Sequence, residues 1–217
     1  MKPFCSGATA DVDLIQAIQG DDPPRAEVNP FYFPEPLAPL VAARKRRQRI
    51  QLPQVLRTIR RMEKRCERLI IEGSGGLLVP LGEGFTVADV IASLDCDVVV
   101  VARNKLGTIN HTLLTVEALR ARSVMRFKVV LMGQSTPDCS ARNNATILRE
   151  TIANVEVFSL PHLGAGALRA ESVKRNVGKI KKTLAQIADP DSLRAVLRKV
   201  CETKQRNEGT EETKKDR

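Results

Sequence analysis

The stretch RLIIEGSGGLLVPL, Arg68 to Leu81, places a carboxylate between an apolar run and a glycine-rich segment. Residues 69–71 are short and hydrophobic, which is typical of a strand that is buried on both faces. Because burying an unpartnered carboxylate is costly, Glu72 is expected at the exposed carboxyl end of this strand or against a cation. Gly73, Gly75 and Gly76 permit backbone angles and close approaches that a Cβ would forbid. Two interpretations stay open: a cation and ligand site, or a solvated glutamate where a strand leaves the sheet.

A second stretch, ARNKLGTINHTLLT, begins at Ala102 and follows a run of four valines. Gly107, Thr108, Ile109 and Asn110 are expected to open a helix there, with Thr108 or Asn110 as its capping residue. Unpaired backbone N–H groups at such a helix start form a natural anion site. A capped helix without any ligand is the alternative interpretation.

The first residues of the chain also combine chemically useful groups. Lys2 and Ser6 offer a cation and a hydroxyl beside turn residues, and Asp11 and Asp13 then open a helix. An unordered terminus is the ordinary expectation for such a segment. The order of Pro, Ser and Gly is instead typical of the exit from a strand.

The elements that position these groups alternate between strands and helices. Strands are expected at residues 69–72, 97–102, 128–132 and 155–160, and helices at 52–68, 86–94, 109–122, 143–153 and 171–187. This alternation predicts βαβ units with a mostly parallel sheet. In such a sheet ligands gather at the carboxyl ends of the strands, and residues 72–76, 103–110 and 161–166 each follow an expected strand. We expect one α/β domain over residues 1–188, a C-terminal helix over 189–201 and a polar, disordered tail over 202–217.

Composition narrows the class of protein. The 217 residues are 42% hydrophobic, which is a globular value, and neither a signal peptide nor a membrane-spanning run is recognisable. Five scattered cysteines without CxxC spacing favour a reducing cytoplasm over a disulfide framework or a zinc site. The net charge of +10 could indicate nucleic-acid binding, but the chain has no tryptophan and one tyrosine to interleave with its basic runs. Solvated helix faces and anion-handling sites are the favoured explanation, and no membrane partner is expected.

Four motifs together resemble the dethiobiotin synthetase family, within the P-loop NTPase superfamily. They are KPFCSG at residues 2–7, VNPFYFPEPLAPLVAAR at 28–44, IIEGSGGLLVPL at 70–81 and ARNKLGTINHTLLT at 102–115. The resemblance runs from Lys2 to about Ala170. It implies an ATP- and Mg²⁺-dependent closure of a cyclic urea from 7,8-diaminononanoate and carbon dioxide. A homodimer is implied as well.

The resemblance also implies roles for individual residues. Lys2 would stabilise the carbamate and the transferring phosphoryl group, and Ser6 would contact the reacting end of the substrate. Asp11 and Glu72 would hold Mg²⁺, with Asp13 as an alternative to Asp11. The amides of Gly107, Thr108, Ile109 and Asn110 would receive the substrate carboxylate across the dimer interface. Nucleotide contacts would come from Asp11, Glu72, Gly73, Ser74 and Gly75 and, beside the base, from Pro161, His162 and Leu163.

Two departures from the family pattern stand out. Met132 occupies the position where an adenine-recognising asparagine is expected, and a methionine cannot supply both a donor and an acceptor. No GxxxxGK[ST] motif occurs, so the first strand and the P-loop helix are missing from the expected fold. We therefore expect that the natural chain begins upstream of Met1 and that the chain as given binds Mg·ATP poorly, with little or no turnover.

Two other classes of protein are alternatives to the enzyme. A degenerate, dimeric binding protein that has lost catalysis is the main alternative. A partition-type or amidation-type ATPase is disfavoured by the segments EPLAPLVAAR and LGTINH, which resemble the diamine-carboxylate site. The two histidines, His111 and His162, are too few and too far apart in sequence for a metal site.

Overall fold

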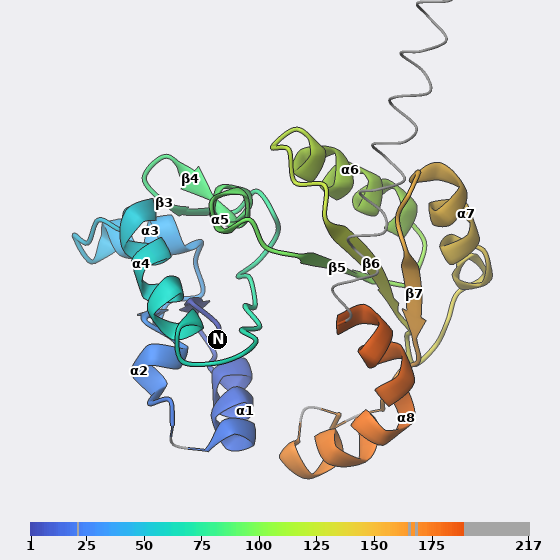
Figure 1. Cartoon of the computed structure of the whole chain (residues 1–217), viewed down its shortest axis with the longest axis horizontal. Helices are drawn as coiled ribbons and strands as arrows, with labels where there is room; N and C mark the ends of the chain where they lie inside the picture. The colour runs from blue at the N-terminus through green and yellow to red at the C-terminus, as the bar shows by residue number, and fades with distance from the viewer. Residues whose placement is uncertain (21, 165, 168, 189–217) are drawn as a thin grey trace, which may run out of the picture. The chain divides into compact units, whose positions relative to one another are not determined.

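The computed structural model describes residues 1–20, 22–164, 166–167 and 169–188. They fall into two compact units, traced in Figure 1. The first unit comprises residues 1–95 and 166–174, and the described part of the second comprises 96–164 and 175–188. The single domain expected over residues 1–188 stays a prediction, and the proposed helix at 189–201 and tail at 202–217 lie outside the described residues.

The first unit begins with a strand that local sequence did not settle. β1 (Phe4–Ser6) pairs in parallel with β2 (Phe31–Phe33), in the register Phe4 to Phe31 and Ser6 to Phe33. The rings of Phe4 and Phe31 stack with centroids 4.8 Å apart. Between the strands lie α1 (Ala10–Gln19) and α2 (Arg25–Val28), and α1 confirms the helix expected to open at Asp11 and Asp13. The start of the chain is therefore an ordered strand and strand exit.

The core of this unit is built on the apolar face of one helix. α4 (Leu52–Glu63) buries Val55, Ile59 and Met62, which recur at the spacing of one helical face. They pack with buried residues of α3 (Pro39–Lys45), of the hairpin β3 (Pro80–Gly82) and β4 (Phe85–Thr86), and of α5 (Val87–Leu94). A capping box formed by Thr86 and Asp89 fixes the start of α5.

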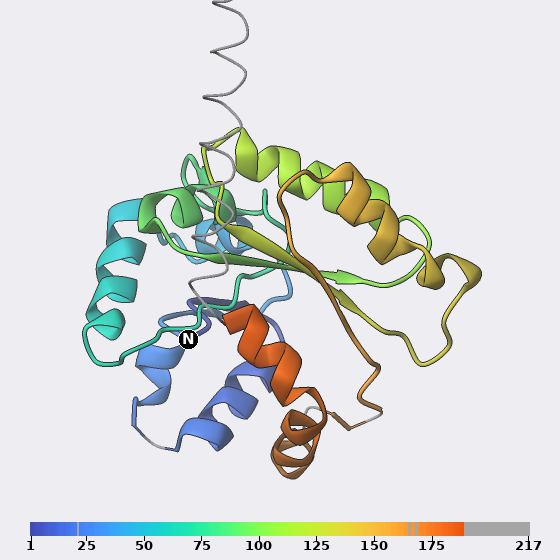
Figure 2. The same ribbon diagram turned by 45° about the vertical axis from the view of Figure 1, so that its right-hand side comes forward.

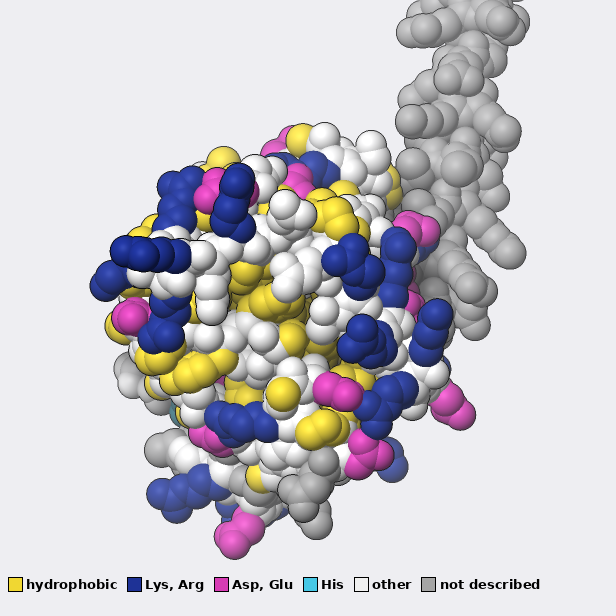
Figure 3. Space-filling model, turned by 90° about the vertical axis from the view of Figure 1, so that its left-hand side faces the viewer, with side chains coloured by type: hydrophobic (Ala, Val, Ile, Leu, Met, Phe, Trp, Pro, Cys, Tyr) yellow, Lys and Arg dark blue, Asp and Glu magenta, His cyan; other side chains and the backbone are white. Residues whose placement is uncertain are grey.

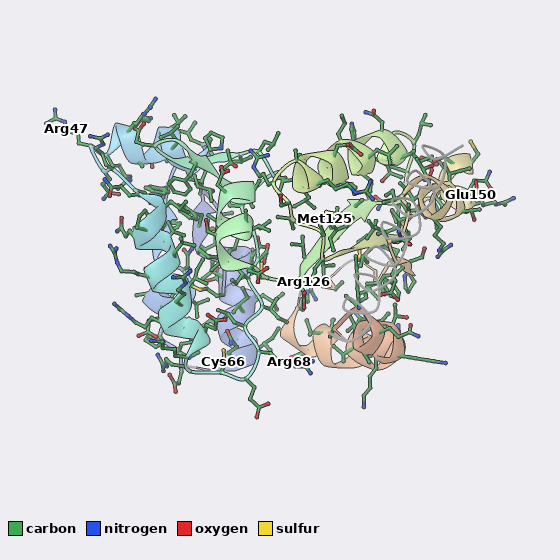
Figure 4. The ribbon with its side chains drawn as sticks, turned by 45° about the horizontal axis from the view of Figure 1, so that its top comes forward. Arg47, Cys66, Arg68, Met125, Arg126 and Glu150 are labelled. Atoms are coloured by element: carbon green, nitrogen blue, oxygen red, sulfur yellow. The ribbon has the colours of Figure 1, made fainter. Side chains whose placement is uncertain are left out.

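The basic runs of the sequence are exposed on the outer faces of α3 and α4. Figure 3 shows Lys and Arg side chains over one face of the molecule, interspersed with Asp and Glu. Part of this positive charge is neutralised by bidentate ion pairs. Arg44 donates to Glu83 at 2.9 and 2.8 Å, and Arg46 donates to Glu35 at 3.2 and 3.3 Å. Figure 4 shows Arg47 in the turn after α3, pointing away from the unit.

The prediction of a buried strand at residues 69–72 is wrong for the described structure, in which this segment has no regular secondary structure. The Met1 ammonium donates to Ile70 O at 2.8 Å, and Glu72 N donates to Met1 O at 2.9 Å. These two bonds have the pattern of one parallel pair, and the pairing does not continue at Pro3, which has no N–H to donate. Ile70 is therefore exposed rather than buried.

The second unit contains a parallel sheet with the strand order β5-β6-β7. β5 (Val98–Arg103), β6 (Phe127–Met132) and β7 (Val157–Leu160) lie close to the positions expected from sequence. β6 is central and buried along most of its length. The parallel pairs in both units, flanked by helices, confirm the expected α/β class with mostly parallel strands.

Helices cover both faces of this sheet. Figure 2 shows α6 (Thr108–Arg120) and α7 (Asn144–Thr151) on one face and the later part of α8 (Ala170–Ala188) on the other. Ile180 of α8 packs on Val130 and Leu160. Lys128, which is fully buried in β6, donates to Gln186 O at 2.6 Å and Ile187 O at 3.1 Å, at the end of α8. This contact satisfies carbonyl groups that a helix end leaves unpaired.

Two finer features differ from what the sequence suggests. β5 is not buried on both faces, because its residues alternate in exposure and Val101 is 64% exposed. Within the described residues β5 pairs only with β6, so it forms an edge of the sheet. α4 ends at Glu63, before the expected residue 68.

No helix in the described ranges has the length and apolarity needed to cross a membrane.

Candidate active site

Lys2 brings two distant carboxylates together in the first unit. Its Nζ atom lies 2.9 Å from Asp11 Oδ2 and 2.5 Å from Glu72 Oε1. The Lys2 side chain is 9% exposed, whereas those of Asp11 and Glu72 are 47% and 50% exposed. Lys2 precedes β1, Asp11 lies in the first turn of α1, and Glu72 is fixed by its backbone bond to Met1. Three separate segments therefore meet at one ammonium group.

The electrostatics of this cluster keep Lys2 charged. Burial by itself lowers the pKa of Lys2, but the hydrogen bonds to Glu72 and Asp11 outweigh it, so the pKa of Lys2 is raised above its ordinary value. The Met1 ammonium behaves differently, because burial dominates there and lowers its pKa. The cluster thus holds a permanent cation within reach of two anions.

Asp13, the alternative to Asp11, points to other partners. It accepts from Arg25 Nη1 at 2.5 Å and from Thr9 Oγ1 at 2.9 Å, and these two hydrogen bonds lower its pKa. The structure thus places Asp11, and not Asp13, against Lys2.

Ser6 is the residue that ends β1, and its hydroxyl is unsatisfied. Within the described residues the buried Ser6 Oγ atom has no hydrogen-bond partner. An orphaned hydroxyl of this kind is uncommon in folded proteins and is explained when a ligand or water completes it.

The glycine-rich segment after Glu72 forms an irregular turn. Gly75 has a positive φ of 72°, and a Cβ there would lie 2.8 Å from Val79 Cγ2. Gly73 and Ser74 precede it in the same loop. A cavity of about 590 Å³ opens beside Glu72, and its walls include Ile15, Met62 and Leu69. Glu72 is therefore accessible to a ligand.

Whether this cluster suits a magnesium ion can be judged from its donor set. Asp11 and Glu72 converge on one point, and both keep about half of their side-chain surface open. Mg²⁺ is commonly bound through one or two carboxylates, with the rest of its shell supplied by water and substrate phosphates. No group of three or more His, Cys, Asp or Glu residues suited to a metal occurs in the described ranges. The two carboxylates therefore fit a phosphate-associated Mg²⁺, not a site made by protein ligands alone.

In the second unit the loop after β5 leads into α6 as expected, with a different cap. Gly107 occupies the N-cap position at a φ of 90°, and neither Thr108 nor Asn110 caps the helix. A left-handed φ of this kind favours glycine, which is why the turn forms at this residue. The described part of the chain offers no acceptor to the amides of Gly107, Ile109 and Asn110, whereas Thr108 N donates to Lys105 O at 3.1 Å. Three of the four predicted amides can thus donate a hydrogen bond to an anion.

A polar network that sequence reasoning missed holds this loop. Asp138 Oδ2 accepts from Leu106 N at 2.8 Å, and Asn144 Nδ2 donates to Asn104 Oδ1 at 2.8 Å. The hydrogen bonds from Ser140 and from Leu106 lower the pKa of Asp138. A signal was present in the segment Pro137-Asp138-Cys139-Ser140, because an aspartate after a proline often caps a short helical turn. Asp138 caps the short helix Cys139–Arg142 in this way.

The predicted base-side loop follows β7. Gly133 N donates to Leu160 O at 2.8 Å, and a Cβ on Gly133 would lie 2.8 Å from His162 N. Pro161 and His162 are exposed, and Leu163 packs near Val130 and Leu160. Met132, at the end of β6, is half-buried in the same cluster.

The predicted site residues therefore fall into two groups. Lys2, Asp11 and Glu72 are in direct contact in the first unit, with Ser6 and residues 73–75 in the same unit. Residues 107–110 and 161–163 belong to the second unit. The joining of the two groups into one site stays a prediction.

Comparison with known proteins adds an independent finding. A family model described as "AAA domain" matches residues 1–165. The chain is 37% identical over 187 residues to the ATP-dependent dethiobiotin synthetase of Anaeromyxobacter sp. (strain Fw109-5), covering 83% of this chain and 84% of that protein. Proteins of the same name from Bacillus velezensis and Bacillus subtilis (strain 168) are each 33% identical over 165 residues. These matches cover 73% of this chain and 70% and 71% of those proteins.

Proposed function

The chain belongs to the family of ATP-dependent dethiobiotin synthetases, and from this premise we propose that it closes the ureido ring of dethiobiotin. One amine of 7,8-diaminononanoate adds to carbon dioxide and loses a proton, giving a carbamate. A carbamate oxygen attacks the γ-phosphorus of ATP, and the bond to ADP breaks. The second amine then attacks the carbamate carbon, loses a proton and expels phosphate as the ring closes.

The observation that carries this proposal is the Lys2 ammonium between Asp11 and Glu72. The carbamate and the transferring phosphoryl group are both anionic, so the reaction needs a fixed cation at a site that is shielded from water. Lys2 is buried, and its raised pKa keeps it protonated at neutral pH. We assign Lys2 the catalytic role of stabilising both anions.

Two neighbouring groups would position the reactants. The unsatisfied Ser6 hydroxyl, at the exit of the strand that follows Lys2, would contact the reacting amine or its carbamate. The open backbone of Gly73, Ser74 and Gly75 would lie against the nucleotide, because the glycines leave room that side chains would fill.

Asp11 and Glu72 are the residues that would hold Mg²⁺. When bound, the ion would neutralise negative charge on the phosphates of ATP. Lys2 would then exchange contacts with these carboxylates for contacts with the incoming anions. The exposure of Asp11 and Glu72 supports this exchange, since both can reach a ligand without unfolding the cluster.

The loop before α6 would receive the carboxylate of the diamine. Its unsatisfied amides at Gly107, Ile109 and Asn110, with Thr108 beside them, form an anion site at a helix start. A homodimer, in which this contact crosses the interface, is part of the proposal. Leu106, directly before α6, and Leu114, within it, support the dimer because these apolar residues are 80% and 61% exposed.

The base of ATP would rest beside Pro161, His162 and Leu163. Met132 lies at the end of the neighbouring strand β6, where it can pack on a base but cannot read both a donor and an acceptor. Weak discrimination between adenine and guanine nucleotides is therefore expected.

The test is a direct assay of ring closure. The chain is incubated with 7,8-diaminononanoate, bicarbonate and Mg·ATP, and dethiobiotin and ADP are measured together. Product formation that requires all three substrates is expected at a low rate, because the chain has no GxxxxGK[ST] motif, with a further loss of at least about 100-fold in Lys2→Met. Lys45→Met, at an exposed lysine in the last turn of α3, serves as the matched control. Product that forms without ATP, or a Lys2→Met chain as active as wild type, would overturn the proposal.

A further inference from the structure

We propose that Asp138 is a positioning residue that shapes the anion-receiving loop before α6 and thereby sets the affinity for the substrate carboxylate. This inference rests on the proposed function, because it concerns the loop assigned above to that carboxylate. Asp138 belongs to the segment after β6, far from the loop in sequence. Nothing in its local sequence indicates a contact with substrate.

Asp138 uses both of its carboxylate oxygens. Oδ2 accepts from Leu106 N at 2.8 Å, whereas Oδ1 accepts from Ser140 N at 2.9 Å and from Ser140 Oγ at 2.5 Å. One side chain thus ties the loop to the start of the short helix Cys139–Arg142. An asparagine could keep only one of these two sets of bonds, because it has a single acceptor oxygen.

The contact continues through a second set of side chains. Asn144 Nδ2 donates to Ser140 Oγ at 3.2 Å and to Asn104 Oδ1 at 2.8 Å, and Asn104 Nδ2 donates to Ala141 O at 3.0 Å. Asn144 is 2% exposed, so this end of the network is buried. The loop is therefore held at Asn104 and at Leu106 by one connected set of hydrogen bonds.

Packing does not hold this loop in the same way. Leu106 is 80% exposed, and Lys105 and Gly107 are exposed as well. A loop with few apolar contacts unfolds locally at a low free-energy cost unless hydrogen bonds hold it in place. The hydrogen bond from Leu106 N to Asp138 is placed directly before Gly107, whose left-handed conformation begins the helix.

The hydrogen bonds around this loop also determine which of its backbone N–H groups remain available to an anion. Leu106 N is taken by Asp138 and Thr108 N by Lys105 O, which leaves Gly107, Ile109 and Asn110 for an anion. Asp138 carries a negative charge near this site, but three N–H and O–H donors are directed at it. Its effect on affinity is thus expected to come through the shape of the loop, and its removal should weaken binding rather than strengthen it.

The experiment measures binding of 7,8-diaminononanoate and of its methyl ester to the full chain by isothermal titration. Wild type is expected to bind the acid more tightly than the ester. In Asp138→Asn the acid should lose about tenfold in affinity, the scale of one hydrogen bond, while the ester and Mg·ATP bind as in wild type. Asp138→Ala should show the same pattern at equal or larger size. Asp97→Asn, which alters a carboxylate paired with Arg126 at the other end of β5, is the matched control and should change nothing.

The outcomes separate two failures. If wild type binds the acid and the ester equally, the carboxylate assignment under the proposed function is wrong, whatever Asp138 does. If wild type prefers the acid and Asp138→Asn, with an unchanged melting temperature, keeps that preference, the positioning role of Asp138 is overturned. A reversed result, in which Asp138→Asn binds the acid more tightly, would show that charge repulsion outweighs positioning and would also overturn it.

Discussion

The Lys2 ammonium and the Glu72 carboxylate are 70 positions apart in the chain and lie 2.5 Å from each other in the structure. Local sequence around either residue does not indicate the other. The contact forms because the backbone of Met1 pairs with Ile70 and Glu72, which brings residue 2 beside residue 72. The catalytic proposal therefore depends on a tertiary contact that can be tested one residue at a time.

Glu72→Gln is expected to lower dethiobiotin formation by at least about 100-fold, the scale of losing one electrostatic element of a transition state. The amide keeps the shape of the side chain but removes the charge that Lys2 and a bound cation would face. Steady-state product formation is the measurement. Glu83→Gln, which changes a surface partner of Arg44, is the control and should stay near wild type. A wild-type rate in Glu72→Gln would exclude the assignment.

Alkaline pH should weaken the fold through Lys2. The folded-state pKa of Lys2 is raised above its ordinary value of 10.5, so its contribution to stability is fully present below that value. The contribution is lost as pH rises through the raised folded-state pKa. Urea unfolding of wild type and Lys2→Met on either side of this window should show a difference that shrinks at the alkaline end. A constant difference would mean that the ion pairs do not stabilise the fold.

Arg47→Gly should stabilise the first unit. Arg47 has a φ of 56° in the turn after α3, and left-handed geometry costs an L-residue about 1 kcal/mol. Glycine removes that cost but gains freedom in the unfolded chain, so a net increase of about 0.5 kcal/mol in unfolding free energy is expected. Arg49→Gly, two residues later and without a positive φ, should destabilise instead. Equal effects of the two substitutions on the urea midpoint would contradict this explanation.

Leu114→Asp should dissociate the proposed homodimer. Leu114 is 61% exposed on α6, so a charge there costs the isolated chain little but would be buried in an interface. Sedimentation velocity at micromolar concentration is expected to show a dimer for wild type and a monomer for the variant. Leu78→Asp, at a leucine 55% exposed in the first unit, is the control and should remain dimeric. A wild-type chain that is monomeric throughout this range would rule out the dimer.

The parts of the fold that sequence predicted well are those with strong local patterns. β5, β6 and β7 follow β-branched runs, and α5, α6 and α7 lie within a few residues of their expected bounds. The expected strand at residues 69–72 has the same apolar pattern, yet it meets a single partner residue, Met1, and remains irregular. A β-strand forms only where a segment pairs with a partner strand. The apolar pattern of one segment does not indicate whether that partner is present.

In the candidate site, too, local sequence predicted some features and missed others. The carboxylates at Asp11 and Glu72 and the amides at residues 107–110 were recognisable by residue type and by the family motifs. The choice of Asp11 over Asp13 as the partner of Lys2 required the structure, since Arg25 takes Asp13. The sequence around Asp138 carries a signal for its capping role but none for its contact with Leu106 N, because that partner is a backbone group 32 positions away.

The close approach at Gly133 limits how nucleotide preference could be altered, whether by evolution or by design. Any side chain at that position would meet the backbone of His162 and push the base-side loop away from β6. Position 133 therefore does not tolerate a side chain, although it directly follows Met132, the position where a base would be recognised. New selectivity would have to be acquired at Met132 or within residues 161–163, where Pro161 and His162 are exposed and have room for other side chains.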